Sequence, residues 1–321
     1  MHRYSRILVT GGAGFIGSHI VDHFLARDIE VTALDNLSGG ALENIKQHIG
    51  KKNFRFIKGD IRDSRLVKNL TKDVDAVIHQ AALVSVPDSL KNPYLTNDVN
   101  VNGTLNLLKA SVNSNVSRFL YASSCAIYGN VEALPIKEEC LPNPTSPYGA
   151  SKLAAENYVR VFYENFDLET VCLRYFNVYG SRQAYNQYSG VITLFLNYLE
   201  KNRPLTIFGD GNQTRDFVHV QDIAEANILA TKTDGIAGEA FNIASGKPTT
   251  INQLANMLLE LTGKTENKIR YSKPRKGDIK HSFADISKAK NKLGYKPKIS
   301  LKDGLSKLLK EHGFKKYRKR R

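Results

Sequence analysis

Residues 7–20 read Ile7-Leu8-Val9-Thr10-Gly11-Gly12-Ala13-Gly14-Phe15-Ile16-Gly17-Ser18-His19-Ile20. An apolar strand here leads into a glycine-rich turn and then into the start of a helix. Gly12, Gly14 and Gly17 follow the pattern G-x-G-x-x-G, and Gly11 adds a second pattern with the last two of them. Glycines let the backbone approach a pyrophosphate, whose charge is stabilised by a helix N-terminus. A tight turn would also explain the glycines, but the flanking strand and helix favour a dinucleotide site.

The residues around this motif alternate short apolar runs with amphipathic ones. We expect strands at Arg6–Thr10, Glu30–Asp35, Phe54–Gly59, Ala76–Gln80, Arg118–Ala122 and Thr170–Arg174. We expect helices between them at Phe15–Ala26, Ser64–Leu70, Pro93–Val112 and Pro147–Asn165. The alternation predicts an α/β fold, a doubly wound parallel sheet of the Rossmann type, with its ligand at the carboxyl ends of the strands.

The pattern changes after Asn177, where turn-rich stretches separate single helices. Those helices are expected at Val191–Lys201, Asp222–Ala230 and Ile251–Thr262. We therefore divide the chain into a dinucleotide-binding domain at 1–176, to which a segment near 214–235 returns, and a smaller α/β substrate lobe at 177–313. Residues 314–321 form a basic tail that we expect to be disordered.

Composition narrows the class of protein. The 321 residues are 41% hydrophobic, with a net charge of +15, and six of the positive charges lie in the last seven residues. A charged terminal run is typical of a solvated tail, so we do not expect nucleic-acid binding. No apolar run is long enough to cross a membrane, and Cys125, Cys140 and Cys172 have neither disulfide nor metal spacing. We expect a cytoplasmic protein without a metal site.

Two acidic positions extend the dinucleotide site. Asp35 ends the second expected strand, 18 residues after Gly17, where a carboxylate accepts hydrogen bonds from the adenosine ribose and repels a 2′-phosphate. No arginine adjoins it, which favours NAD over NADP. Asp60 and Ile61 follow the third strand and are placed to meet the adenine, although Asp60 could also be a simple strand-end residue, and Asn36 lies beside Asp35.

Tyr148 and Lys152 are spaced i, i+4 at the start of an expected helix, which puts them on one face, one turn apart. An ammonium beside a phenol lowers the pKa of the phenol, so that tyrosine can act as a base near neutral pH. Such a pair alone is often an exposed surface pair. Ser124 follows the fifth strand at the ligand-binding edge, where its hydroxyl can share a proton with a substrate oxygen.

At this point the chain resembles the extended short-chain dehydrogenase/reductase family over nearly its full length. The resemblance rests on motifs in the family's order: Thr10-Gly11-Gly12-Ala13-Gly14-Phe15-Ile16-Gly17, Asp60-Ile61-Arg62-Asp63, His79-Gln80-Ala81-Ala82, Asn100-Val101-Asn102-Gly103-Thr104, Ser123-Ser124, Tyr148-Gly149-Ala150-Ser151-Lys152 and Arg174-Tyr175-Phe176-Asn177. Within the family it looks most like the UDP-glucose and UDP-N-acetylglucosamine 4-epimerases.

The resemblance implies a tightly held NAD and a role for each matching residue. Tyr148 would take the proton from the sugar 4-hydroxyl, Lys152 would bind the nicotinamide ribose and Ser124 would hold the 4-oxygen. The cofactor contacts it implies are Gly11, Gly14, Phe15, Ile16, Gly17, Asp35, Asn36, Asp60, Ile61, Gln80, Ala81, Ala82, Asn100, Tyr148, Lys152 and Tyr175. The UDP-sugar contacts are Ser124, Tyr148, Asn177, Val191, Arg215, Arg275, Asp278 and Ser282, with the two arginines on the phosphates.

Sister enzymes differ at single positions. The dehydratases carry Asp-Glu after the serine position and the UDP-glucuronate decarboxylases keep the Glu, whereas this chain has Cys125 and Ala126. UDP-glucuronate 4-epimerases tend to have Thr at Asn177. We therefore expect an isomerase, a UDP-hexose 4-epimerase. Another nucleotide-sugar-modifying relative (a UDP-glucuronate epimerase, a dehydratase or a reductase) and a non-catalytic NAD-binding partner protein stay open.

Two further expectations follow from the resemblance. Related enzymes pair the helices matching Pro93–Val112 and Pro147–Asn165 in a homodimer, and both helices are apolar enough here, although packing on the sheet would look similar. Ser282 matches a position where a bulky Tyr excludes N-acetylated sugars. A small Ser predicts room for UDP-N-acetylglucosamine and UDP-N-acetylgalactosamine as well as for UDP-glucose and UDP-galactose.

Overall fold

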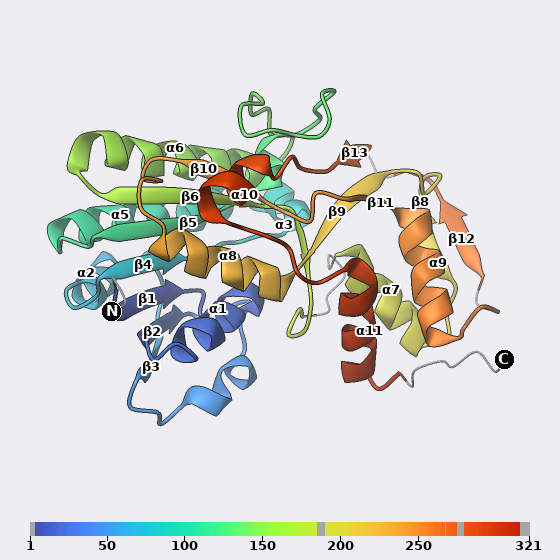
Figure 1. The fold of residues 1–321 in the computed structure, drawn as a ribbon, viewed down its shortest axis with the longest axis horizontal. Coiled ribbons are helices and arrows are strands. Elements are labelled where there is room, and N and C mark those ends of the chain that lie inside the picture. Colours follow the sequence, from blue (N-terminus) through green and yellow to red (C-terminus); the bar gives the residue numbers. More distant parts are fainter. Residues whose placement is uncertain (1–3, 185–189, 267, 275–278, 315–321) are drawn as a thin grey trace.

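A computed structural model describes residues 4–184, 190–266, 268–274 and 279–314. Its centre is a seven-stranded sheet in the order β10-β6-β5-β4-β1-β2-β3, and every neighbouring pair is parallel (Figure 1). The strands are β1 (Arg6–Thr10), β2 (Glu30–Asp35), β3 (Phe54–Lys58), β4 (Ala76–His79), β5 (Arg118–Ser124), β6 (Glu169–Tyr175) and β10 (Ala240–Ile243). The predicted doubly wound α/β fold is confirmed. The strand order reverses between β1 and β4, where such sheets bind their ligands.

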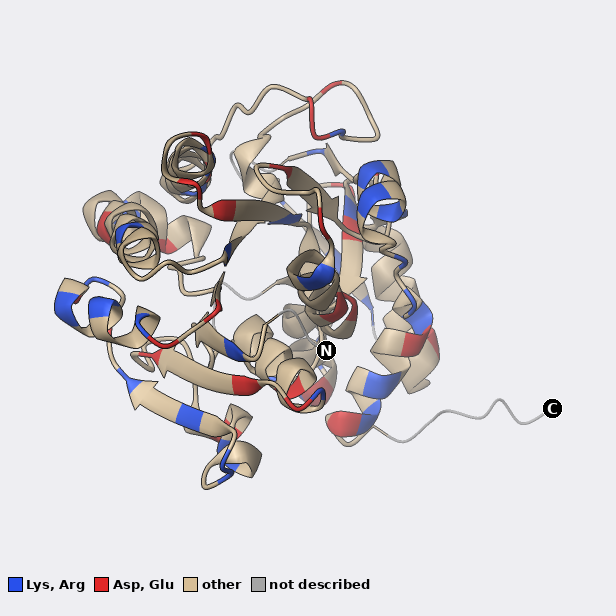
Figure 2. Cartoon of the chain, turned by 60° about the vertical axis from the view of Figure 1, so that its left-hand side comes forward, with Lys and Arg blue, Asp and Glu red and all other residues tan. Residues whose placement is uncertain are grey.

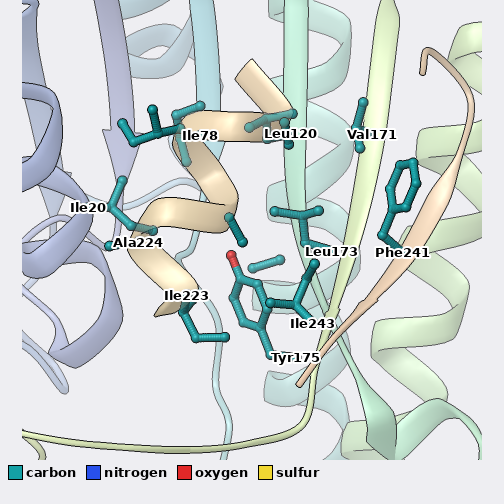
Figure 3. Packing of buried hydrophobic residues seen from close by; sticks show 14 of the residues in the cluster. Ile20, Ile78, Leu120, Val171, Leu173, Tyr175, Ile223, Ala224, Phe241 and Ile243 are labelled. Carbon is teal, nitrogen blue, oxygen red and sulfur yellow. The ribbon is translucent and has the colours of Figure 1, made fainter. Parts of the chain in front are cut away.

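Helices cover both faces of this sheet, which is why its strands are nearly continuous apolar runs. One face carries α1 (Phe15–Leu25) and α8 (Val220–Lys232); the other carries α2 (Ser64–Thr71), α5 (Gly103–Asn113) and α6 (Pro147–Phe166). Successive strand residues alternate between the two cores, so that Leu120 packs toward α1 and α8 while Tyr121 packs toward α5 and α6. Figure 3 shows the first of these cores, with Ile20 and Ala224 near Ile78 and Leu120.

The region expected as one helix at Pro93–Val112 differs in the structure. It divides into α4 (Pro93–Asn97), a π-helical turn η3 (Asp98–Asn102) and α5, and a short helix α3 (Val86–Lys91) precedes it. The wider turn faces the site described below, because Asn100 bonds the backbone of Leu83 beside the ligand cavity. Local π geometry is typical of such positions. Short 3₁₀ turns lie at η1 (Leu42–Asn44), η2 (Lys46–His48) and η4 (Cys125–Ile127).

A second core lies in the other lobe. Its helices are α7 (Val191–Glu200), α9 (Ile251–Thr262) and α11 (Leu301–Glu311), and its strands are β7 (Asn177–Tyr179), β8 (Leu205–Phe208), β9 (Thr214–His219), β11 (Pro248–Thr250), β12 (Ile269–Ser272) and β13 (His281–Ser282). Strand β9 pairs with β7, β11 and β13, and β8 pairs with β12. Phe314, the first residue of the predicted tail, packs on this core, and residues 315–321 lie outside the described residues.

The second half of the chain returns to the large sheet. Helix α8 lies against α1, β10 forms the edge strand beside β6, and α10 (Ser287–Leu293) packs on β10 (Figure 1). The buried Arg118 of β5 donates to the carbonyl oxygens of Ala230 and Thr233 at the end of α8, at 2.9 and 2.6 Å. The division of the chain near residue 176 stays a prediction.

Charge is spread rather than gathered in the view of Figure 2, where Lys and Arg occur on helices and strands of both lobes with Asp and Glu between them. Several lysines are paired; Lys288 and Lys292, for example, both reach Glu239. Among the helices described here, none is long and apolar enough to cross a membrane.

Candidate active site

A cavity of about 390 Å³ opens at the carboxyl ends of the central strands. That volume is in the range that holds a small-molecule ligand. Sixteen of the predicted site residues line it: Gly11, Gly14, Phe15, Ile16, Gly17, Asp35, Asn36, Asp60, Ile61, Gln80, Ala81, Ala82, Ser124, Tyr148, Lys152 and Tyr175. The structure thus brings together nearly all residues expected around the cofactor and the reacting atoms.

The glycine turn forms one wall of the cavity. Gly11 has a φ of +67°, and a Cβ on Gly17 would lie 2.0 Å from the carbonyl oxygen of Gly11. Gly14 is the N-cap of α1 and gives no side-chain cap, so the first N–H groups of that helix are open toward the cavity. This bare helix N-terminus in a tight glycine turn fits the pyrophosphate of a dinucleotide.

Asp35 and Asp60 lie at the other end of the same wall. The buried carboxylate of Asp35 accepts hydrogen bonds from the backbone N–H groups of Ala13, at 3.0 Å, and Leu37, at 2.8 Å. Asp60 accepts from Asn36 Nδ2 at 2.9 Å and from Arg62, and the bond from Arg62 lowers the pKa of Asp60 to about 2. The Asp60 carboxylate is therefore ionised near neutral pH, and hydrogen bonds hold both carboxylates in place.

Asn100 is the exception among the expected cofactor residues, because it does not line the cavity. It is buried, and its side chain bonds both the N–H and the C=O of Leu83, at 2.8 and 3.0 Å, and the hydroxyl of Ser151, at 2.9 Å. The structure places it behind the wall, where it holds the loop after β4 against α6. Tyr175 and Gln80 do line the cavity and contact each other, with Gln80 Nε2 3.2 Å from the Tyr175 hydroxyl.

The three expected catalytic side chains meet at the cavity floor. Ser124 ends β5, and Tyr148 and Lys152 lie on the first turns of α6, which begins after the N-cap Ser146 and Pro147. Burial raises the pKa of Tyr148 to about 12, although its hydrogen bond with Ser124 opposes the rise. Burial also lowers the pKa of Lys152 to about 7, with the carboxylate of Glu156 opposing the fall. Both groups are thus pushed toward their neutral forms, so charge in a bound ligand has a large influence on them.

A second cavity, of about 200 Å³, holds three of the expected substrate residues: Asn177, Val191 and Arg215. It is also lined by the aromatic side chains of Tyr198 and Phe208. The Oδ1 atom of Asn177 is buried and has no hydrogen-bond partner among the residues that the structure describes. A buried acceptor of this kind requires a donor, which a ligand can supply.

Ser282 lines neither of these cavities. It is buried, it is paired with Arg215 in the β9–β13 register, and its hydroxyl bonds the thiol of Cys125, the residue after Ser124. The predicted contacts Arg275 and Asp278 lie outside the described residues.

Sequence reasoning missed several lining residues. Phe176, Val178 and Gln183 line the first cavity, and Tyr198 and Phe208 line the second. Gln183 lies on an irregular loop, and the two aromatic residues lie on elements without a motif, so the sequence held no signal for them. Within the described ranges, no group of three or more His, Cys, Asp or Glu side chains is arranged to hold a metal ion.

The fold and the site define the class first. A glycine turn, an acidic residue after β2 and a Ser, Tyr and Lys set at the strand ends are features of the extended short-chain dehydrogenases/reductases. Residues 7–244 match the NAD dependent epimerase/dehydratase family, and the chain belongs to that family. NAD is therefore its cofactor, and the glycine turn and Asp35 fit it.

Individual relatives agree with this assignment. The chain is 36% identical to the UDP-glucose 4-epimerase of Mycolicibacterium smegmatis, over 94% of this chain and 96% of the relative. Among solved structures it is similar to the UDP-glucose 4-epimerase of Thermotoga maritima with UDP-glucose (38% identity, TM-score 0.90, 96% of this chain and 98% of the other). It is also similar to the UDP-N-acetylglucosamine 4-epimerase of Methanobrevibacter ruminantium M1 in complex with UDP-N-acetylmuramic acid (40% identity, TM-score 0.91, 95% and 97%).

Proposed function

We propose that this protein interconverts UDP-hexoses by NAD-dependent 4-epimerisation through a transient 4-keto sugar. The observation that carries the proposal is the Tyr148 hydroxyl, bonded to Ser124 and lying with Lys152 in the cavity that also holds the glycine turn and Asp35. A base and its partners are therefore built into the site where the cofactor fits. The residues after Ser124, Cys125 and Ala126, carry no carboxylate for an elimination, which argues against a dehydratase.

Each catalytic side chain has a separate task in this proposal. Tyr148 Oη takes the proton from the sugar 4-hydroxyl and returns it at the end of the reaction, while Ser124 Oγ shares the hydrogen bond at the 4-oxygen. Lys152 binds the nicotinamide ribose, and its charge lowers the cost of forming the Tyr148 phenolate. NAD, when bound in this cavity, would supply the reversible hydride-transfer chemistry of the reaction.

The nucleotide part of the substrate belongs in the second cavity. The Arg215 guanidinium suits a diphosphate because it donates in a rigid fork and stays charged. The unpartnered Oδ1 of Asn177 would accept a hydrogen bond from the sugar, and Tyr198 and Phe208 offer aromatic faces to the base. Arg275 and Asp278 are proposed as further UDP-sugar contacts because of the family resemblance.

The first test is turnover by purified protein without added reductant, on UDP-glucose, UDP-galactose and their N-acetyl forms. Replacing Tyr148 by Phe removes the base, and we expect a loss of at least about a hundredfold in kcat with the fold and the bound NAD retained. Near-normal turnover by this variant, or no conversion of any of the four sugars by the wild type, contradicts the proposal.

Sugar size is the finer part of the proposal. Ser282 is small, and its hydroxyl contacts Cys125, the residue after Ser124. This contact supports the proposal that N-acetylated UDP-hexoses are accepted. Replacing Ser282 by Tyr is expected to abolish turnover of the acetylated pair by steric exclusion and to spare the plain pair. Replacing Ser282 by Ala is the matched control, and it is expected to retain both pairs. Continued turnover of acetylated sugars by the Tyr variant shows that Ser282 is not the gate.

We also propose that the protein works as a homodimer in the cytoplasm. Large apolar side chains are exposed on the helices that the resemblance pairs, with Tyr94 at 91% and Leu95 at 42% exposed on α4, and Tyr158 and Val161 exposed on α6. The three cysteines are free, as a reducing compartment favours. Sedimentation equilibrium of the wild type checks the dimer, and replacement of Tyr94 and Tyr158 by Lys is expected to give monomers.

A further inference from the structure

The ammonium of Lys152 rests on an aromatic face that lies behind the active site. Its Nζ is 4.6 Å from the centroid of the Tyr121 ring, within the range of a cation–π interaction. Tyr121 lies on β5 and points toward α6, with a side chain that is 1% exposed. Its hydroxyl also donates to the backbone carbonyl of Lys152 at 3.4 Å. Tyr121 does not line the ligand cavity, so it acts on the site through Lys152.

The other groups near Lys152 do not offer a direct counter-charge. In the described part of the chain, no carboxylate lies within ion-pair distance of Lys152 Nζ. Glu156, one turn further along α6, is the nearest candidate, but Ser123 and Arg174 occupy its carboxylate, with Arg174 Nη2 2.5 Å from Oε1. Glu156 therefore acts on Lys152 only from a distance.

The remaining titratable neighbours are neutral. Burial lowers the pKa of His79 on β4 to about 3 and raises the pKa of Cys172 on β6 well above its usual value. Tyr148, on α6 itself, is a neutral phenol in the free site because burial raises its pKa to about 12. The face of the Tyr121 ring is thus a close group that favours the charged form of Lys152, in addition to the more distant Glu156 carboxylate.

We propose that Tyr121 is a positioning residue of the reaction, whose ring holds the Lys152 ammonium in its charged form and in place beside Tyr148. The inference rests on the proposed function, because it gives Lys152 a role that needs the charge. Burial lowers the pKa of Lys152 to about 7, so a modest interaction decides how much of it is charged under working conditions. A desolvated cation–π contact is large enough to move that pKa by roughly half a unit to one and a half units.

The test separates the ring from the hydroxyl. Tyr121→Phe keeps the ring and removes the hydroxyl, Tyr121→Leu removes the ring, and pentafluorophenylalanine at position 121 keeps the shape while reversing the charge distribution of the ring face. We expect the alkaline limb of the kcat/KM profile to move to lower pH by about half a unit to one and a half units in the Leu and pentafluoro variants. The Phe variant should keep the wild-type profile. Circular dichroism of each holoenzyme confirms the fold.

A second readout needs no substrate. The nitrogen chemical shift of Lys152 Nζ in lysine-labelled protein, assigned by the loss of its signal in Lys152→Met, reports the ionisation of Lys152 itself. Loss of the ring face should move this titration to lower pH by about half a unit to one and a half units in the pentafluoro variant and leave it unchanged in the Phe variant. If wild-type protein does not convert UDP-hexoses, the proposed function fails, while this titration still tests the contact.

Three outcomes overturn the inference. In the first, the alkaline limb and the titration both stay in place in a folded pentafluoro variant. In the second, the Phe variant shifts as far as the Leu variant, which assigns the effect to the hydroxyl. In the third, activity falls equally at every pH without a shift, which is the result of a purely structural role.

Discussion

Asp35 shows how one side chain serves the backbone and the ligand together. Its two oxygens accept from the N–H groups of Ala13 and Leu37, so the carboxylate braces the glycine turn while it lines the cavity. A Cβ on Gly40 would lie 2.9 Å from Oδ2, so a glycine there lets the loop pass close to the carboxylate. An uncharged replacement therefore disturbs both the turn and the selection of cofactor.

We expect Asp35→Asn to weaken NAD retention and to relax discrimination against NADP. The amide no longer repels a 2′-phosphate. Its NH₂ group also faces a backbone N–H, so two donors meet where a donor and an acceptor were paired. The measurements are the NAD content of purified protein and the affinities for both dinucleotides. The exposed Asp73, changed to Asn, is the control and should behave as wild type. If the Asp35 variant still holds stoichiometric NAD and still rejects NADP, Asp35 stabilises the turn and does not select the cofactor.

Among single residues, the catalytic side chains near strand ends could be predicted from the sequence. Ser124, Tyr148 and Lys152 could be predicted because carboxyl ends of parallel strands meet at one edge, and i, i+4 residues share a helix face. Tyr121 could not, because its role depends on a contact between the far side of a strand and a helix. Asn100 was assigned to the cofactor, whereas its side chain bonds Leu83 and Ser151 behind the cavity wall.

Among the elements, the C-terminal end of α8 is hydrogen-bonded by one buried side chain, Arg118. Arg118 is 1% exposed, donates to carbonyl oxygens at the C-terminus of α8 and pairs with Glu169 of β6 at 2.5 Å. A cation at this position satisfies carbonyls that have no partner within the helix and interacts favourably with the helix dipole. It thus joins an element from the second half of the chain to the first sheet.

We expect Arg118→Met to lower the free energy of unfolding by about 1–3 kcal/mol, because the buried carbonyl oxygens at the end of α8 lose their donor. Chemical denaturation followed by circular dichroism measures the change. Arg160→Met, at a side chain that is 59% exposed and pairs with Glu164 at i+4, should change stability by less than about 1 kcal/mol. Similar stabilities of the two variants would show that α8 is held by apolar packing alone.

Elements with strong periodicity were predictable, and short or irregular ones were not. The six expected strands of the large sheet all occur, since buried parallel strands are distinct apolar runs. Strand β10 was missed because the four residues Ala240–Ile243 carry no period of their own and become a strand only by pairing with β6. The π-helical turn was missed for a similar reason, because its hydrogen bonds to Leu83 come from tertiary structure.

For the whole molecule, three buried imidazoles with lowered pKa contribute to the way stability responds to acid. Burial lowers the pKa of His19 to about 4, of His79 to about 3 and of His219 to about 4. Unfolded histidines titrate near 6.5, so between these values the unfolded chain binds more protons than the folded one. Stability contributed by these groups is present above about pH 6.5 and is lost as the pH falls toward 4.

Denaturant unfolding at fixed NAD between pH 7 and 4 measures this effect. Over most of that pH range His79 is protonated in the unfolded chain and neutral in the folded protein. It should therefore add up to about 1.4 kcal/mol per pH unit to the slope of the free energy of unfolding against pH. His79→Asn is expected to be less stable at pH 7, because contacts to Thr10 and Thr104 change, and to have a flatter slope by that amount. An unchanged slope in the variant would mean that His79 is protonated in the folded protein.

The late position of β10 has a consequence for synthesis. Until residue 243 has left the ribosome, β6 is an unpaired edge whose residues Val171 and Leu173 are fully buried in the finished protein. A nascent chain of this length exposes a strand edge together with apolar surface, the combination that templates aggregation. The sheet is therefore incomplete while the first half of the chain emerges. Strand β10, which completes it, is synthesised about seventy residues after β6. We therefore expect lower growth temperatures, or added chaperones, to raise the soluble yield of this protein.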